Sequence, residues 1–310
     1  MIKEIFKLVR FPNLFLLAIA QLLLHYVFLK GNFIPTALGD GYIWALVLST
    51  VFIAAGGYII NNIQDQSVDA VNGTDKNPVG KSISETAAYN AYFVLTVGGV
   101  GLGYWLSNYI DKPIFFGLFV LSAATLYLYA TSFKGSLLVG NILIAFMVAL
   151  SQLMVPIFDL IPVIFPETKS QMATLFLILT DMAVYAFILT LFREMVKDME
   201  DIKGDAQQGH NTLPLVIGLR KTAIVLASLS SLLVLYLVYY TYSNLMVNQH
   251  YLAVIYLLIV VIAPLVFFVF KIIKATEKKE FAMLSMLLKI MLVLGLAALY
   301  VITYSISNHV

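Results

Sequence analysis

The stretch "IWALVLSTVFIAAGGYIINNIQDQSVDAV", residues 43–71, joins a long apolar run to a regularly spaced polar one. Its first part, up to Asn62, has no charged side chain and has about the length that an α-helix needs to cross a bilayer. Asn61, Asp65 and Asp69 then follow one another every four residues, so on a continuing helix they share one face. The stretch therefore predicts a membrane-spanning helix that ends in a row of oxygen donors.

The composition of the whole chain extends this interpretation. Of its 310 residues, 61% are hydrophobic and 12% are charged, whereas a soluble domain has about 25% charged residues. We therefore expect an all-α, polytopic membrane protein whose residues 1–310 form a single domain. The formal net charge of +2 argues against a nucleic-acid partner, and no protein partner is implied. Because the chain has no cysteine, thiol catalysis and disulfides are excluded.

Nine apolar segments are long enough to cross a membrane. They lie near residues 12–30, 43–62, 87–106, 113–131, 137–158, 173–196, 222–242, 251–271 and 282–306. We predict nine transmembrane helices around a central cavity. The lysines and arginines of the loops favour a cytoplasmic N-terminus, because the opposite side then carries only Lys30, Lys112 and Lys169. The C-terminus would lie outside.

A second acidic cluster, "REMVKDMEDIKGD", occupies residues 193–205. Its Asp198, Asp201 and Asp205 are three and four residues apart and share a helix face. Like charges at this spacing repel each other, so a cation is expected among them. Oxygen donors without Cys or His suit Mg²⁺, which also shares phosphate oxygens. Solvated loop acids are the plainer alternative, but two such clusters on one side, each with neighbouring basic residues, favour a site for a diphosphate with an apolar tail.

Both clusters resemble the signatures of the UbiA superfamily of intramembrane prenyltransferases. Asn61-Asn62-x-x-Asp65-x-x-x-Asp69 is similar to the first signature, usually N-D-x-x-D-x-x-x-D, and Asp198-x-x-Asp201-x-x-x-Asp205 is similar to the second. Asn62 stands where an Asp is usual. An amide offers an oxygen but no charge, so either the metal is held less tightly or position 62 is not a direct ligand.

Two further stretches resemble one branch of that superfamily, the digeranylgeranylglyceryl phosphate synthases. They are "REMVKDMEDIKGDAQQGHNTLPLVIG", residues 193–218, and "YATSFKGSLLVGN", residues 129–141, with Tyr129, Lys134 and Asn141. The loop "DKNPVGKSIS", residues 75–84, lacks the arginine that the family has there. Lys76 or Lys81 could replace it.

The resemblance implies Mg²⁺-dependent transfer of a geranylgeranyl group from its diphosphate to the hydroxyl of a prenylated glycerol phosphate, which gives an ether-lipid precursor. The enzyme would lie in the cell membrane with its site facing the cytoplasm, among membrane lipids. One Mg²⁺ would be held by Asn61, Asp65 and Asp69, and a second by Asp198, Asp201 and Asp205. The catalytic residues implied are Asp65, Asp69, Lys197, Asp198 and Asp201. The substrate-binding residues implied are Asn61, Asn62, Lys81, Tyr129, Lys134, Asn141, Arg193 and Asp205.

Two other functions stay open. Sister branches with the same motifs prenylate aromatic acceptors of the quinone, tocopherol or chlorophyll type. A secondary transporter also carries intramembrane charge, but near the midplane, whereas these acids lie at the ends of spans. The sequence also leaves open the roles of Asp181, of His210 (a general base or an ordinary loop residue) and of Lys289 (a snorkelling side chain or a substrate contact).

Overall fold

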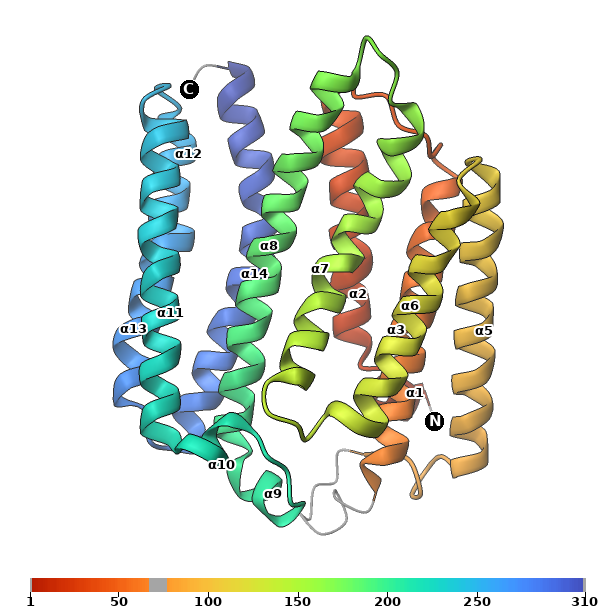
Figure 1. The fold of residues 1–310 in the computed structure, drawn as a ribbon, viewed down its shortest axis with the longest axis vertical. Coiled ribbons are helices and arrows are strands. Elements are labelled where there is room, and N and C mark those ends of the chain that lie inside the picture. The colour runs from red at the N-terminus through yellow and green to blue at the C-terminus, as the bar shows by residue number, and fades with distance from the viewer. Residues whose placement is uncertain (1, 67–76, 309–310) are drawn as a thin grey trace. The chain divides into compact units, whose positions relative to one another are not determined.

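The protein is helical in the computed structural model, which describes residues 2–66 and 77–308, with side chains to residue 305. Figure 1 shows the helices in chain order. The α-helices are α1 (Ile2–Leu8), α2 (Phe11–Leu22), α3 (Tyr42–Gln64), α5 (Glu85–Tyr109), α6 (Phe116–Leu128), α7 (Val139–Asp159), α8 (Lys169–Glu200), α9 (Ile202–Gln207), α10 (Leu213–Ile217), α11 (Leu219–Tyr240), α12 (Tyr251–Tyr256), α13 (Ala263–Lys274) and α14 (Lys278–Asn308). No β-strand occurs in the described ranges, which contain one isolated bridge, between Val79 and Ile83.

Wider π-helical turns extend four of these helices. They are η1 (Leu23–Leu29), η4 (Tyr129–Phe133), η6 (Thr241–Met246) and η7 (Leu257–Ile262). Short 3₁₀ turns, η2 (Lys30–Asn32), η3 (Pro113–Phe115) and η5 (Ile161–Val163), complete the helical segments. The apolar segments of the sequence are thus helical, except that residues 137 and 138 of the fifth segment lie in the turn before α7.

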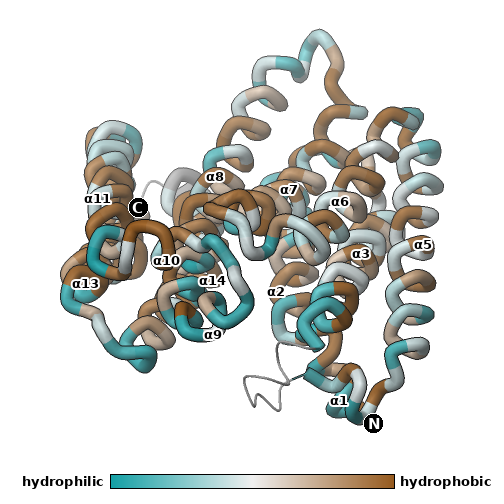
Figure 2. The backbone as a smooth tube through the Cα atoms, turned by 60° about the horizontal axis from the view of Figure 1, so that its bottom comes forward, coloured by the Kyte–Doolittle hydropathy of each residue, from teal (hydrophilic) through white to brown (hydrophobic). Residues whose placement is uncertain are grey.

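Eight helical segments of the described residues are long and apolar enough to cross a membrane. They are Phe11–Asn32, Tyr42–Gln64, Pro113–Phe133, Val139–Val163, Lys169–Glu200, Leu219–Met246, Tyr251–Lys274 and Lys278–Ser305. Figure 2 shows hydrophobic residues along the long helices and hydrophilic residues at helix ends and on α9. The remaining predicted span coincides with α5, whose glycine, tyrosine and asparagine residues lower its mean hydropathy. The all-α membrane fold is confirmed, while the count of nine and the side of the N-terminus stay predictions.

The chain divides into two compact units. Unit 1 comprises Met1–Lys134 and Phe146–Ala183, and unit 2 comprises Gly135–Ala145 and Val184–Val310. Helices α7 and α8 each contribute residues to both units.

In unit 1, α5 packs closely against both α3 and α6 because glycines let the helices approach each other. A Cβ on Gly99 of α5 would lie 2.9 Å from the carbonyl oxygen of Ser49, and one on Gly103 would lie 2.3 Å from the ring of Phe119. The Ser49 hydroxyl donates a 2.6 Å hydrogen bond to the Gly99 carbonyl oxygen. Gly56 of α3 is equally close to Thr96 of α5. These contacts fix α3, which carries the first acidic motif.

Unit 1 also contains a buried hydrogen-bonded pair of His25 and Asp159 at the end of α7. The Nδ1 atom of His25 lies 2.7 Å from Oδ2 of Asp159, and both side chains are fully buried. The backbone N–H of Leu38 donates to Oδ1 of the same carboxylate at 3.1 Å. Nearby on α2, the Gln21 amide donates a 2.6 Å hydrogen bond to the Ser151 carbonyl oxygen of α7. Polar groups thus join α2, α7 and the segment before α3.

In unit 2, one hydrophobic cluster joins α8, α10, α11, α13 and α14. Its fully buried members include Val196, Leu226, Phe268 and Leu284. A cluster around Leu257 packs α12 and η7 against α14. This core anchors the end of α8, from which the second acidic motif emerges.

Candidate active site

The first acidic motif begins in the last turn of α3. The backbone N–H of Asp65 caps this helix by donating a 3.0 Å hydrogen bond to the Asn61 carbonyl oxygen. The Asn61 side-chain amide donates a 2.8 Å hydrogen bond to Oδ2 of Asp65, and the Lys134 ammonium forms an ion pair with the same oxygen. The structure thus brings together Asn61, Asp65 and Lys134, three of the predicted site residues. All three are at most partly exposed.

Asn62 points away from this group. Its Nδ2 donates a 2.8 Å hydrogen bond to the backbone carbonyl oxygen of Leu8, the last residue of α1. Its own carbonyl oxygen accepts a 2.8 Å hydrogen bond from the side chain of Asn77. Asn62 therefore contacts the N-terminal helix and the chain that returns after the first motif.

The other predicted residues of this unit are placed less completely. Asp69 and Lys76 lie outside the described residues. Lys81 is exposed in the turn that precedes α5. Tyr129 begins η4 and packs partly buried against the cluster of Ile59, Ile60 and neighbouring residues. The π-helical turn of η4 leads directly into Lys134, the partner of Asp65.

The second motif starts on the last turns of α8. Nδ2 of Asn141, near the start of α7, donates a 2.7 Å hydrogen bond to Oδ2 of Asp198. The carboxylates of Glu194, Asp201 and Asp205 add repulsive charge around Asp198. A negative charge crowded in this way is stabilised by a cation.

Asp201 and Lys197 form a chain of ion pairs. The Lys197 ammonium lies 2.9 Å from Oε2 of Glu200 and 3.3 Å from Oδ2 of Asp201. Lys278, at the start of α14, lies 3.8 Å from the other oxygen of Asp201. Lys197 is thus held against acidic side chains on its own helix and the turn that follows.

Asp205 on α9 is held by the loop that follows it. Oδ1 lies 3.2 Å from Nδ1 of His210, and Oδ2 accepts a hydrogen bond of 3.4 Å from the Thr212 hydroxyl. Burial raises the pKa of Asp205 above its ordinary value, although the contact with His210 opposes this shift. His210 therefore orients a motif carboxylate.

The loop between η4 and α7 completes this part of the site. The carbonyl oxygen of Gly135 accepts a 2.8 Å hydrogen bond from the backbone N–H of Asn211. A Cβ on Gly135 would lie only 2.3 Å from Cδ2 of His210, so the imidazole packs directly on this glycine. Within unit 2, Gly135 and Asn141 are therefore both in contact with the stretch that carries the second motif.

Arg193 and Lys289 supply further positive charge. Nη1 of Arg193 lies 2.6 Å from Oε1 of Glu194. Its Nε atom is buried and has no hydrogen-bond partner among the described residues. Lys289 of α14 lies near enough to Arg193 for the two charges to repel each other. Asp181, by contrast, is exposed on α8.

The donor chemistry of both motifs fits a hard divalent cation. The side chains offer carboxylate and amide oxygens, which Mg²⁺ prefers. Within the described part of the chain, however, no three His, Cys, Asp or Glu side chains are gathered closely enough to hold one ion. Each described motif carboxylate is instead in contact with an amide, an ammonium or an imidazole. The metal-ligand assignments stay predictions.

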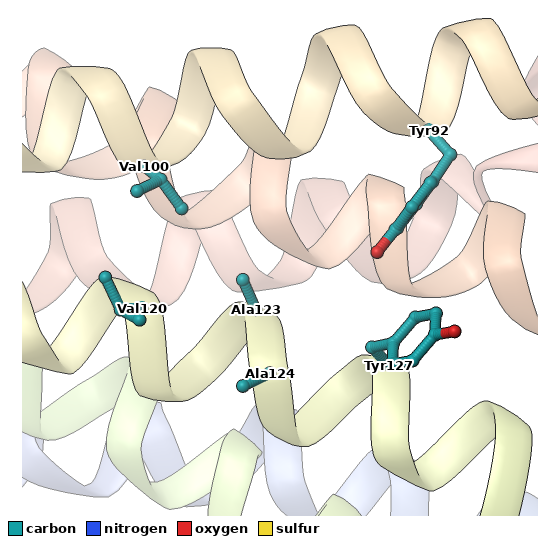
Figure 3. Close-up of a pocket in the computed structure, with 6 residues that line it drawn as sticks. All are labelled: Tyr92, Val100, Val120, Ala123, Ala124 and Tyr127. Atoms are coloured by element: carbon teal, nitrogen blue, oxygen red, sulfur yellow. The ribbon is translucent and has the colours of Figure 1, made fainter.

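A pocket of about 370 Å³ lies between α5 and α6. Figure 3 shows Tyr92 and Val100 of α5 facing Val120, Ala123, Ala124 and Tyr127 of α6. None of the predicted site residues is among the residues that line it. This apolar groove is therefore separate from the polar groups described above.

Residues 26–293 match the UbiA prenyltransferase family. The chain belongs to this family. The match runs through both units, and the prediction of an integral membrane prenyltransferase is confirmed.

Among the relatives of this UbiA family member are digeranylgeranylglyceryl phosphate synthases. Digeranylgeranylglyceryl phosphate synthase of Sulfurisphaera tokodaii is 33% identical over 221 residues, which cover 71% of this chain and 72% of that protein. A solved digeranylgeranylglyceryl phosphate synthase structure has a TM-score of 0.64 and 22% identity, with 99% of each chain covered. A UbiA homologue from Archaeoglobus fulgidus bound to GPP and Mg²⁺ has a TM-score of 0.58 and 16% identity, with 96% of this chain and 99% of that chain covered. The two structures share the fold of this protein.

Sequence reasoning missed several residues of the site. Thr212, Gly135 and Asn77 carry no charge and lie outside the acidic motifs, so neither charge nor spacing points to them. Gly135 and Thr212 each have one signal, because they lie within the two stretches that resemble the synthase branch. The contact of Gly135 with His210 became evident only from the structure.

Proposed function

We propose that this UbiA family member transfers a geranylgeranyl group from its diphosphate to the hydroxyl of a geranylgeranylated glycerol phosphate. The product would be an ether-lipid precursor. The observation that carries this proposal is the contact between the two stretches that resemble the synthase branch. Asn141 holds Asp198, while Gly135 contacts His210 and Asn211. The 33% identity to a synthase of that name supports it.

The reaction forms one C–O bond and breaks another. The acceptor oxygen bonds to the allylic carbon of the prenyl chain, and the bond from that carbon to the diphosphate breaks. The acceptor hydroxyl gives its proton to the departing diphosphate or to water. Bound Mg²⁺ supplies charge neutralisation to the departing diphosphate. The residues that would hold the ions are Asn61, Asp65 and Asp69 for one, and Asp198, Asp201 and Asp205 for the other.

Side chains of this protein would orient the two substrates. Arg193 has a buried Nε without a partner among the described residues, and it suits a diphosphate oxygen. Lys134 and Lys197 would exchange their carboxylate partners for phosphate oxygens. Lys81 and Tyr129 stay proposed substrate-binding residues, and Asn62 stays a member of the first motif. Residues 1–310 would act as one domain, with nine spans, a cytoplasmic N-terminus and a site facing the cytoplasm.

The test uses purified full-length protein in lipid nanodiscs. Geranylgeranyl diphosphate and Mg²⁺ are supplied with either geranylgeranylglyceryl phosphate or a phenol, and diphosphate release and product mass are measured. We expect the ether product, and we expect Asp65→Ala and Asp198→Ala each to lower the rate by about 100-fold or more. Asp181→Ala, on the exposed face of α8, is the matched control and should react at the wild-type rate.

Three results would count against the proposal. If Asp65→Ala and Asp198→Ala both release diphosphate at the wild-type rate, the two aspartates are not catalytic residues. An alkylated phenol without ether product would assign an aromatic acceptor. A protein that moves solute across the bilayer and releases no diphosphate would be a transporter.

A further inference from the structure

We propose that Asn62 is a positioning residue that fastens α1 to the end of α3, and that it is not a metal ligand. This inference rests on the proposed function only where it assumes that Asp65 holds Mg²⁺. It explains why an amide occupies a position where the family usually has a carboxylate.

The side chain of Asn62 is used as a hydrogen-bond donor. Its Nδ2 lies 2.8 Å from the carbonyl oxygen of Leu8, which ends α1. The last carbonyl groups of a helix have no partner within it, so they need a donor from elsewhere. Asn62 is 8% exposed and Leu8 is 4% exposed, so water is largely excluded from this contact. A carboxylate at position 62 would set oxygen against oxygen here.

The apolar surroundings reinforce the same connection. Leu8 packs in a buried cluster with Ile59, Ile60 and Ile63 of α3. The polar bond and the apolar contacts thus join the same two helices. Removal of the donor would leave a buried carbonyl oxygen without a partner, which is the costly part of losing such a bond.

The backbone of Asn62 holds a second segment. Its carbonyl oxygen accepts a 2.8 Å hydrogen bond from the side chain of Asn77, whose own oxygen accepts the N–H of Val79 at 3.0 Å. Asn77 is therefore connected to the last turn of α3. Residue 62 connects three parts of unit 1.

The link to the first motif runs through the neighbouring residue. Successive residues on an α-helix point about 100° apart, so Asn61 faces Asp65 while Asn62 faces α1. If α1 is released, the last turn of α3 loses its support on one side. The oxygen donors on the other side, Asn61 and Asp65, then lose their fixed geometry.

The experiment compares Asn62→Asp and Asn62→Ala with wild type in nanodiscs. One measurement is hydrogen exchange at the amides of residues 2–10. The other is the Mg²⁺ concentration at which the rise in melting temperature caused by Mg²⁺ reaches half of its maximum. We expect exchange in α1 to become about fivefold faster in both variants. We expect the half-saturating Mg²⁺ concentration to rise about tenfold, as for other residues that support metal ligands.

The two variants separate positioning from direct ligation. A ligand at position 62 predicts that Asn62→Asp binds Mg²⁺ more tightly and that α1 exchange is unchanged in both variants; either observation overturns the proposal. Faster α1 exchange with an unchanged Mg²⁺ response overturns the link to Asp65. Protection of the α11 amides verifies that each variant is folded, and Asn108→Ala, at the end of α5, is the control for loss of an exposed amide.

Both readouts are independent of catalysis. If wild-type protein releases no diphosphate from geranylgeranyl diphosphate, prenyl transfer fails while hydrogen exchange still decides the role of Asn62. The two failures are therefore distinguishable.

Discussion

The Asn141 side chain donates a 2.7 Å hydrogen bond to the carboxylate of Asp198, although the two residues are 57 positions apart in the sequence. We expect Asn141→Ala to lower diphosphate release by about tenfold or more, because a hydrogen bond to a charged group contributes about 1.5–3 kcal/mol. Asn141→Asp should lower it further, since two carboxylates would then face each other. Steady-state release assays measure both variants. Wild-type activity in Asn141→Asp would show that this contact does not matter.

The packing of His210 on Gly135 predicts a coupling between the two positions. In Gly135→Ala the new Cβ would collide with the imidazole, whose Cδ2 lies 2.3 Å from that point. His210 must then move away from Asp205, and we expect an activity loss of about tenfold. In a protein that already carries His210→Ala the collision is absent, so adding Gly135→Ala should lower the activity much less than tenfold. A double-mutant cycle measures this difference, and additive effects would refute the contact.

The buried pair of His25 and Asp159 is expected to stabilise unit 1. Asp159→Ala leaves a buried imidazole and the Leu38 N–H without a partner. We expect the free energy of unfolding to fall by about 3 kcal/mol, as measured by chemical denaturation in detergent. Asp40→Asn breaks the exposed pair with Lys30, so it serves as the control and should unfold like wild type. Equal stability of all three proteins would contradict this role.

Two glycines on α5 should respond to alanine in opposite ways. Gly103→Ala would place a Cβ 2.3 Å from the fully buried ring of Phe119, and we expect destabilisation by about 1–3 kcal/mol. A Cβ on Gly101 meets nothing within 4 Å, so Gly101→Ala should raise stability by up to about 1 kcal/mol through helix propensity. Thermal unfolding of the two variants compares them directly. Similar melting temperatures would mean that α5 does not pack on α6 as described.

Hydropathy alone predicts most of the fold. The apolar segments from 12–30 to 282–306 are helical apart from residues 137 and 138, because a long apolar run in lipid is stable only if its backbone bonds are satisfied internally. Hydropathy could not predict the four π-helical turns, which depend on single surplus residues and local packing. It also could not pair His25 with Asp159, since 134 positions separate them.

The candidate site was predictable in its ionic parts. Regular spacing identified Asp65, Asp198 and Asp205 because acids three or four residues apart share a helix face. The same spacing placed Asn61 beside Asp65, where the structure has it. Spacing could not show that Asn62 contacts Leu8, because that depends on how α1 folds back on α3. Asp69 stays a prediction, outside the described residues.

The π-helical turn of η4, Tyr129–Phe133, ends directly before Lys134. A turn of this kind carries one more residue than an α-helical turn, and each residue of an α-helix rotates the next side chain by about 100°. Removal of one residue from the turn would let the chain continue as an ordinary helix while swinging the Lys134 ammonium away from Asp65. A single-codon deletion there would thus leave the span intact and separate the motif from its cation, so the number of residues in this turn decides where the ammonium lies.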